Sequence, residues 1–247
     1  MKKVLITGST SGIGRSLALA YAKIGHQVLA CGRSQDKLDS LIADAEQLSG
    51  TITPVLFDVN NKEQRDAALS SLDNLDIAIL NAGDCEYIDR PMEFDGKLFE
   101  RIINTNLISI GFLIETLLPK LNNNNARPAQ LSLVGSSVTY LPLPRAEAYG
   151  ASKAGLRYLA ESLNIDLIDH NIHVSLVSPG FIKTPLTDKN DFEMPFLISS
   201  DEAANRIISG LESYKHFIDF PKRFTWIMKA MRILPFSIWR KMAKKNK

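Results

Sequence analysis

A glycine-rich turn between a strand and a helix, near the start of the chain, constrains the fold more than any other stretch. Residues 3–6 are typical of a short buried strand, and residues 15–22 are typical of a helix. Between them, Gly8 allows a tight turn, Gly12 lets the backbone approach a phosphate, and Gly14 lets helix and strand pack closely. The helix directs its free N–H groups and its positive dipole end at the same place. The pattern therefore predicts a dinucleotide-binding turn.

Further strands and helices alternate along the chain with few breaks. We expect the later strands at residues 27–32, 51–58, 76–81, 131–135, 173–177 and 216–220, and a polar loop at 122–125. This alternation is typical of a parallel sheet with helices on both faces, so the predicted fold class is α/β with a doubly wound sheet. No internal repeat or linker interrupts it, and we place one domain at residues 1–220 and a tail at residues 221–247.

Cysteine and histidine usage indicates the cellular setting and argues against a metal site. Cys31 and Cys85 give no disulfide framework, which favours a reducing, cytoplasmic location. The four histidines are scattered along the sequence, so we expect no metal. The apolar start of the chain is interrupted at residues 7–11, and no run of about 18 apolar residues follows. We therefore expect neither a signal peptide nor a membrane-spanning helix.

A cation rather than a carboxylate follows the second expected strand. In a dinucleotide-binding fold this strand ends beside the adenosine ribose, where an acidic residue bonds the 2′-hydroxyl of NAD. Gly32 and Arg33 occupy this region, and a guanidinium without a neighbouring carboxylate suits a 2′-phosphate. This arrangement indicates NADP(H), with Arg15 as a weaker second contact.

Tyr149 and Lys153 are the central catalytic candidates. They stand four residues apart on an expected helix and therefore share one face. The reference pKa of a phenol is about 10, so tyrosine is a poor acid or base at neutral pH unless a nearby positive charge favours the phenolate. Lys153 provides such a charge, and we expect it to lower the pKa of Tyr149 and to hold a ribose hydroxyl of the cofactor.

Together these segments resemble the short-chain dehydrogenase/reductase family over about residues 3–220. The Thr-Gly-x3-Gly-x-Gly turn resembles its cofactor loop. Asn81-Ala82-Gly83 resembles most of its Asn-Asn-Ala-Gly segment, with Leu80 in place of the first Asn. The resemblance implies a Rossmann-type sheet of about seven strands and a homodimer or homotetramer. It also implies that the cofactor contacts are Gly8, Ser9, Thr10, Ser11, Gly12, Ile13, Gly14, Arg33, Asp58, Val59, Asn81, Ala82, Gly83, Tyr149, Lys153, Pro179, Gly180, Ile182 and Thr184.

The resemblance implies two further catalytic residues. Ser136 lies 13 residues before Tyr149 and just past the fifth expected strand, which is the spacing of the family's catalytic serine; Ser137 beside it is the alternative. The serine hydroxyl would bond and polarise the substrate oxygen. Asn106 matches the family asparagine that supports the lysine through a water molecule, with Asn104 as the competing choice.

These residues imply hydride transfer between C4 of a nicotinamide and a carbonyl or carbinol carbon. In the reducing direction, Tyr149 would protonate the developing alkoxide while Ser136 orients it. Lys153 would tune the tyrosine, and Asn106 would support a proton relay. We therefore predict an NADP(H)-dependent oxidoreductase, such as a carbonyl reductase. An NAD-dependent alcohol dehydrogenase and a cofactor-sensing binding protein without turnover are the alternatives.

Two apolar segments follow the sixth expected strand. Residues 185–200 would form the substrate lid in this family, and their composition favours a hydrophobic small-molecule substrate. The tail at 221–247 carries nine Lys or Arg and no Asp or Glu, which leaves a net charge of −7 on the rest of the chain. Its tryptophans and cations suit an anionic membrane surface; packing on the domain or on a second subunit is the equal alternative. We expect no nucleic acid partner, because no binding module is present.

Overall fold

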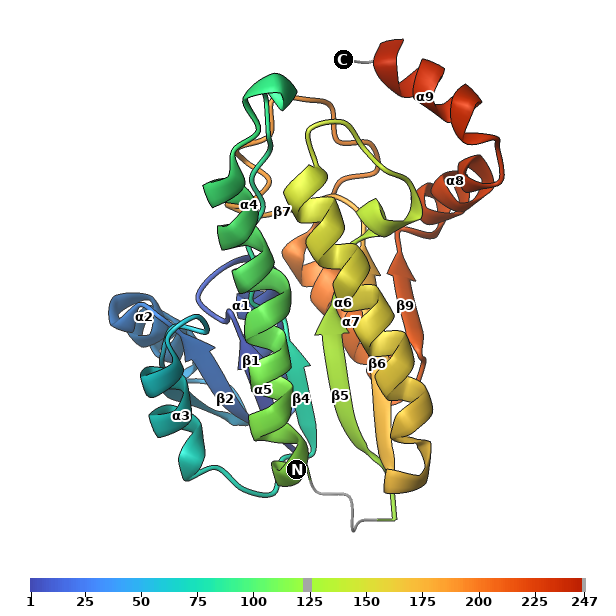
Figure 1. The fold of residues 1–247 in the computed structure, drawn as a ribbon. Coiled ribbons are helices and arrows are strands. Elements are labelled where there is room, and N and C mark those ends of the chain that lie inside the picture. Colours follow the sequence, from blue (N-terminus) through green and yellow to red (C-terminus); the bar gives the residue numbers. More distant parts are fainter. Residues whose placement is uncertain (122–125, 246–247) are drawn as a thin grey trace.

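The computed structural model describes residues 1–121 and 126–245 and arranges them as a parallel sheet between two layers of helices (Figure 1). In this part of the chain the main sheet has seven strands in the order β3-β2-β1-β4-β5-β6-β9. Their bounds are Lys3–Thr7 (β1), Gln27–Gly32 (β2), Thr51–Leu56 (β3), Ile77–Leu80 (β4), Ala129–Val134 (β5), Ile172–Pro179 (β6) and Phe217–Phe220 (β9). The predicted α/β, doubly wound Rossmann-type fold is confirmed, and the expected loop at 122–125 lies outside the described residues.

Apolar runs explain why the central strands lie inside the fold. In β1, Val4 pairs with Val28 of β2 on one side and with Ile77 of β4 on the other. The β4 and β5 strands are buried at every position, as expected of a parallel sheet covered on both faces. Both β3 and β4 end before the predicted limits, so Asp58 and Asn81 lie in loops beyond the carboxyl edge of the sheet.

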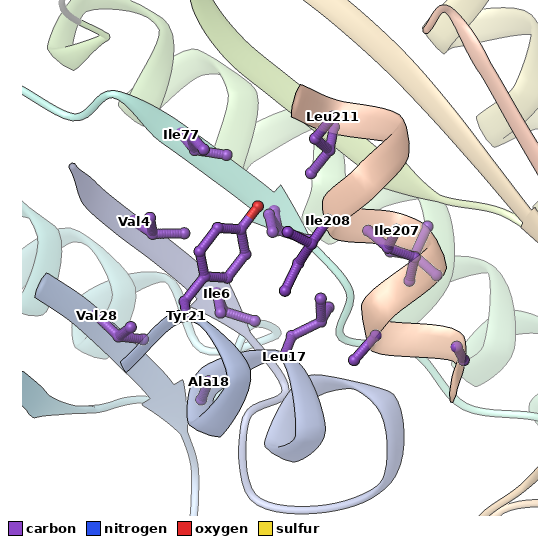
Figure 2. Close-up of a cluster of buried hydrophobic side chains, with 14 of the residues drawn as sticks. Val4, Ile6, Leu17, Ala18, Tyr21, Val28, Ile77, Ile207, Ile208 and Leu211 are labelled. Carbon is purple, nitrogen blue, oxygen red and sulfur yellow. The ribbon is translucent and has the colours of Figure 1, made fainter. Parts of the chain in front are cut away.

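Helices of both layers bury apolar faces against this sheet. The bounds are Gly12–Lys23 (α1), Gln35–Ala45 (α2), Lys62–Ser70 (α3), Gly96–Ile103 (α4), Ser109–Leu117 (α5), Glu147–Asp166 (α6) and Ser200–Glu212 (α7). On one face, Figure 2 shows Leu17 and Tyr21 of α1 gathered with Ile208 and Leu211 of α7 beside Val4 of β1. On the other face, α3, α5 and α6 contribute to a second buried cluster. Each such side chain stabilises the fold by about 1.5–3 kcal/mol.

Local sequence signals set several helix ends. Gly25 follows α1 with φ +83°, in the left-handed region that terminates helices. The capping residue of α7 is Ser199, whose Oγ accepts a hydrogen bond from the N–H of Glu202 at 3.1 Å. The α6 helix begins at Glu147, so Tyr149 lies in its first turn.

Among the described residues, one helical stretch, Gly96–Lys120, is long and apolar enough to cross a membrane by length and composition. In the fold this stretch packs against the sheet and α6, with Ile102, Ile110 and Leu113 fully or almost fully buried. It therefore behaves as a core helix of the domain. A π-helical turn at Asn104–Ile108 joins its two parts, α4 and α5.

The tail forms two helices at the end of the molecule where the strands terminate (Figure 1). These are α8 (Lys222–Arg232) and α9 (Phe236–Lys245), which are separated near Pro235, a residue that cannot donate a backbone hydrogen bond within a helix. The buried residues of α8 include Phe224 and Met228, which pack on Tyr140 and Leu141 of the domain. The first part of the tail therefore packs on its own domain. The division of the chain at residue 220 stays a prediction.

A buried carboxylate fixes α8 to the last strand. Asp219 of β9 accepts hydrogen bonds from Lys222 at 2.5 Å and from Lys229 at 2.8 Å, and its side chain is only 5% exposed. Burial alone would raise the pKa of Asp219. Hydrogen bonds from Lys222, Lys229 and Thr225 outweigh burial and lower the pKa to about 2.

We expect Asp219→Asn to lower the free energy of unfolding at pH 7 by on the order of 2 kcal/mol, because the variant loses the carboxylate whose pKa the fold lowers to about 2. The native pKa lies below the unfolded value, so this stability is present above about pH 4 and is lost as the pH falls toward 2. Thermal unfolding of the native protein and the variant, from pH 7 to pH 2.5, measures this contribution to stability. The difference in Tm between native protein and variant should narrow only below about pH 4. A Tm difference that stays constant down to pH 2.5 would contradict this account. So would an equal loss of Tm in Asp169→Asn, because Asp169 is exposed.

Candidate active site

A cleft of about 540 Å³ opens along the carboxyl edge of the sheet. Its walls come from the loops after β1, β2, β3, β4, β5 and β6, which is where open α/β sheets bind ligands. Most of the predicted site residues line this cleft. They are Gly8, Ser11, Gly12, Ile13, Arg33, Asp58, Val59, Asn81, Ala82, Gly83, Ser136, Tyr149, Lys153, Pro179, Gly180, Ile182 and Thr184.

The glycine turn packs closely against neighbouring backbone, as the motif predicts. Gly8 and Gly12 have φ values of +70° and +52°. A Cβ on Gly14 would lie 2.2 Å from the carbonyl oxygen of Gly8. The Asn81 side-chain amide donates to the carbonyl oxygens of Thr7 at 3.0 Å and Gly8 at 3.3 Å. No side chain can therefore replace these three glycines without moving the neighbouring backbone or side chains.

Three predicted contacts lie beneath the turn instead of lining the cleft. The Ser9 hydroxyl is buried and donates to the carbonyl oxygen of Ile6 at 2.7 Å. The Thr10 methyl lies 2.4 Å from where a Cβ on Gly32 would be, and Gly14 packs on the turn itself. These residues shape the turn, whereas Ser11 and Gly12 present the start of α1 to the cleft.

This cradle fits the phosphates of a dinucleotide cofactor. The α1 helix begins at Gly12 beside the cleft, and its first turn holds no acidic residue that would compete with a bound anion. The free N–H groups and the helix dipole favour a phosphate there. A Cβ at Gly8, Gly12 or Gly14 would meet other protein atoms at 2.9 Å or less, so only glycine allows the turn to pack this closely. Gly8 and Gly12 also line the cleft, where their backbone faces the space for a ligand.

Two cations stand after β2, where the adenosine ribose would bind. Arg33 has a 78% exposed side chain whose guanidinium lies 3.7 Å from an Asp58 carboxylate oxygen. Lys37, one turn into α2, also lines the cleft and was not expected from the sequence. Its position four residues after Arg33 is the signal that could have found it. Arg15, the weaker candidate, pairs instead with Asp44 and does not line the cleft.

Tyr149, Ser136 and Lys153 meet in one part of the cleft. Ser136 hydrogen-bonds with the Tyr149 phenol, and its Oγ also accepts from the N–H of Val138 at 3.2 Å. Ser137, the alternative serine, is buried and does not line the cleft. The geometry therefore favours Ser136 as the serine that meets a ligand.

The expectation that Lys153 lowers the pKa of Tyr149 differs from what the structure gives. Burial raises the pKa of the phenol above its ordinary value, and the Ser136 hydrogen bond offsets this only in part. Burial also lowers the pKa of Lys153, to about 8. The ammonium lies 5.9 Å from the Tyr149 ring centre and donates to the carbonyl oxygen of Val134 at 2.9 Å. Desolvation outweighs charge stabilisation in this state, so the phenol is protonated.

Asn106 lies in the π-helical turn and is completely buried. Its side chain accepts from the N–H of Asp84 and donates to the Ser152 hydroxyl at 2.9 Å. It approaches the lysine across Gly83: a Cβ there would lie 3.0 Å from Asn106 Oδ1 and 3.3 Å from Lys153 Nζ. The competing Asn104 is exposed. The wider π turn thus places Asn106 between the loop after β4 and α6.

Thr7 is a supporting residue that sequence reasoning did not include in the site. Its Oγ1 accepts from the backbone N–H groups of Asn81 and Ala82, both at 3.0 Å. This ties the loop after β4 to the end of β1. Leu80, which replaces the family's first asparagine, is buried in the sheet core.

The predicted lid is held at both ends. The short strands β7 (Ile182–Lys183) and β8 (Ile198–Ser199) pair at its base. Arg145 links it to the loop after β4, since its guanidinium pairs with Asp89 at 2.7 Å and with Asp191 at 2.9 Å. An edge-to-face contact of 5.8 Å between Tyr87 and Phe192 reinforces the link. The lid is therefore attached to the loop after β4 as well as at its base.

Comparisons with known proteins agree with this geometry. A family model described as short chain dehydrogenase matches residues 2–194. An uncharacterized oxidoreductase of Myxococcus xanthus is 30% identical over 238 residues, which cover 95% of this chain and 93% of that protein. A 3-oxoacyl-acyl-carrier-protein reductase of Thermotoga maritima is 32% identical over 194 residues, covering 76% of this chain and 77% of that protein. A solved short-chain dehydrogenase from Sphingobium yanoikuyae in complex with NADPH has a TM-score of 0.81 at 24% identity, covering 94% of each chain.

We expect Gly14→Ala to lower the free energy of unfolding by about 1–3 kcal/mol and to weaken dinucleotide binding, because the new methyl must displace backbone. Gly111→Ala is the matched control: it lies in α5 with nothing within 4 Å of a new Cβ, and should stabilise by up to about 1 kcal/mol. Thermal unfolding and nicotinamide fluorescence measure both effects. Equal behaviour of the two variants would contradict the close packing of the turn.

Proposed function

This chain belongs to the short-chain dehydrogenase/reductase family, and on that premise we propose that it is an NADP(H)-dependent oxidoreductase acting on an apolar ketone, aldehyde or secondary alcohol. One observation carries this proposal. Tyr149, Ser136 and Lys153 line the same cleft as the glycine turn, so a bound dinucleotide and a small carbonyl compound would meet at these side chains. No group of three or more His, Cys, Asp or Glu in the described part of the chain could hold a metal ion.

The preference for NADP(H) is supported by the charges after β2. Arg33 and Lys37 line the cleft there, and Gly32 leaves no carboxylate to bond a ribose hydroxyl. A guanidinium recognises a phosphate through paired N–H donors, and an ammonium adds a point charge. Asp58, 3.7 Å from Arg33, is the observation that favours the NAD alternative, because a carboxylate there partly neutralises the guanidinium.

The proposed chemistry assigns one role to each side chain. When bound, the nicotinamide supplies or accepts the hydride. The Tyr149 phenol is protonated and donates its proton to the substrate oxygen as charge develops on it. The Ser136 hydroxyl holds that oxygen in place. Lys153, with a pKa of about 8, carries a positive charge at neutral pH and stabilises the tyrosine oxygen when it loses its proton. Asn106 positions the loop after β4 against the lysine.

An apolar substrate is supported by the apolar side chains of the lid and of the loops that the lid contacts. Phe192 of the lid packs on Tyr87 and on Phe181, with ring centres 5.8 and 5.9 Å apart. Leu186 of the lid lines the cleft directly. Such a surface excludes water around the reacting carbonyl and favours substrates with long or bulky apolar groups.

We expect Arg33→Gln to weaken NADPH binding about tenfold or more and to leave NADH binding unchanged, because only NADPH carries the 2′-phosphate. Nicotinamide fluorescence during titration of the purified protein measures both dissociation constants. Arg206→Gln on α7 is the control, since this arginine does not line the cleft. Tighter binding of NADH than NADPH by the native protein would move the assignment to an NAD-dependent dehydrogenase.

We expect Tyr149→Phe to reduce kcat/KM for NADPH-dependent ketone reduction by about 10²–10⁴, with NADPH affinity retained. Ser136→Ala should lose activity by about 10²–10³, whereas Ser137→Ala should change it little, since only Ser136 lines the cleft. Initial rates on ketones of increasing chain length give the measurement. Full activity of Tyr149→Phe would refute the mechanism. NADPH binding without turnover of any carbonyl compound would favour the cofactor-sensing alternative.

A further inference from the structure

The tail lies beside the lid and continues its apolar surface. Phe224 of α8 packs against Phe181 and against Phe196 of the lid, with ring centres 5.5 and 6.2 Å apart. In Figure 1, α8, α9 and the lid loop lie at the end of the molecule toward which the strands point. Phe196 and Leu197 of the lid are both more than 40% exposed. The apolar surface therefore extends from the lid onto the tail.

The face of α8 that points away from the domain carries exposed apolar residues among exposed cations. Phe224 and Met228 face the domain. Trp226 and Ile233, seven residues apart and therefore on one side of the helix, are 70% and 86% exposed. A water-soluble helix ordinarily carries polar residues on the face away from its core. The outer face of α8 thus has the composition of a contact surface.

The α9 helix separates apolar and basic residues cleanly. Phe236, Ile238 and Met242 fall on one face and are 43% to 63% exposed. Lys241 and Lys244 fall on the other and are also exposed. Trp239, on the apolar side, donates from its indole N–H to the carbonyl oxygen of Pro142 at 2.9 Å, and this bond attaches α9 to the domain. The pattern is that of a helix lying in a membrane interface.

Most of the tail cations whose side chains the structure describes are unpaired. Lys222 and Lys229 both pair with Asp219. Within residues 1–121 and 126–244, no carboxylate lies within ion-pair distance of the tail's other described cations, which are Arg223, Arg232, Arg240, Lys241 and Lys244. These charges are therefore available to anionic groups outside the molecule, and each basic residue near an anionic lipid surface contributes about 1 kcal/mol to binding.

We propose that α8 and α9 dock the protein on an anionic lipid bilayer. The occupant is a membrane because exposed apolar side chains, tryptophans and unpaired cations stand together on two helices, which matches the layered chemistry of acyl chains, interface and headgroups. Docking through this surface brings the lid close to the bilayer. An apolar substrate would then reach the cleft from the lipid phase, a step that rests on the proposed function.

The chain offers a direct reporter, because both of its tryptophans, Trp226 and Trp239, lie in the tail. We would add vesicles of phosphatidylcholine with about one third phosphatidylglycerol to the purified full chain, and vesicles of phosphatidylcholine alone. The expected result is a blue shift of tryptophan emission, protection from an aqueous quencher and co-sedimentation, all with anionic vesicles. Binding should weaken steeply as the salt concentration rises.

Matched double variants separate the two faces of α9 from general surface effects. Ile238→Ser with Met242→Ser should reduce vesicle binding about tenfold or more, by removing apolar burial. Lys241→Gln with Lys244→Gln should reduce it about 30-fold, at about 1 kcal/mol for each charge. Ile165→Ser with Ile168→Ser is the control, since both residues are more than 70% exposed on another part of the surface. It should bind like the native protein.

Three outcomes would overturn the proposal. They are an unchanged tryptophan spectrum with anionic vesicles, equal binding by all the variants, or a light-scattering mass that shows self-association lost only in the Ile238→Ser, Met242→Ser variant, without vesicle binding. The last result would assign the surface to a second copy of the chain. NADPH titration in the same samples keeps a failure here distinct from a failure of the proposed function, because none of the three vesicle readouts depends on turnover.

Discussion

The close approach of α1 to β1 and β4 is the constraint on which the whole carboxyl edge of the sheet depends. Gly14 has no side chain, so the carbonyl oxygen of Gly8 occupies the place of its Cβ. The Asn81 amide bonds this carbonyl and that of Thr7, and the Thr7 hydroxyl holds the loop after β4 in return. A few hydrogen bonds therefore fix the start of α1 and the loop that carries Gly83. The cleft exists because these backbones meet so closely.

Burial governs the titration of the catalytic candidates in the same way that it governs the fold. It raises the pKa of Tyr149 and lowers that of Lys153, so each is driven toward its neutral form. The Ser136 hydroxyl and the Val134 carbonyl oxygen supply only part of the hydrogen bonding that water would give. A ligand with hydroxyl or carbonyl oxygens would give Tyr149 and Lys153 the hydrogen bonds that they lack. The same two side chains would therefore also recognise the ligand.

Predictions from sequence succeeded where a residue's role depends on its neighbours in the chain. The strand, glycine turn and helix, the position of Arg33 and the four-residue spacing of Tyr149 and Lys153 are local patterns, and the structure brings them to one cleft. Sequence patterns did not predict the contacts between segments that are far apart in the chain. Arg145 meets Asp89 across 56 residues, and no periodicity indicates that pair. The pKa of Tyr149 was predicted in the wrong direction because desolvation depends on how completely the surrounding loops cover the ring.

The tail is held to the domain both by polar contacts and by buried apolar side chains. The α8 helix is attached to the domain by the ion pair between Lys222 and Asp219 and by the burial of Phe224. The outer face of α8 therefore has a fixed orientation relative to the lid. The α9 helix is held by one indole hydrogen bond to Pro142, in the same loop as Arg145, which latches the lid to the domain. The tail and the lid are therefore both attached to the loop after β5, through Pro142 and Arg145. Because this loop also carries Ser136, the attachments of the tail and of the lid lie in the same connection as a catalytic candidate.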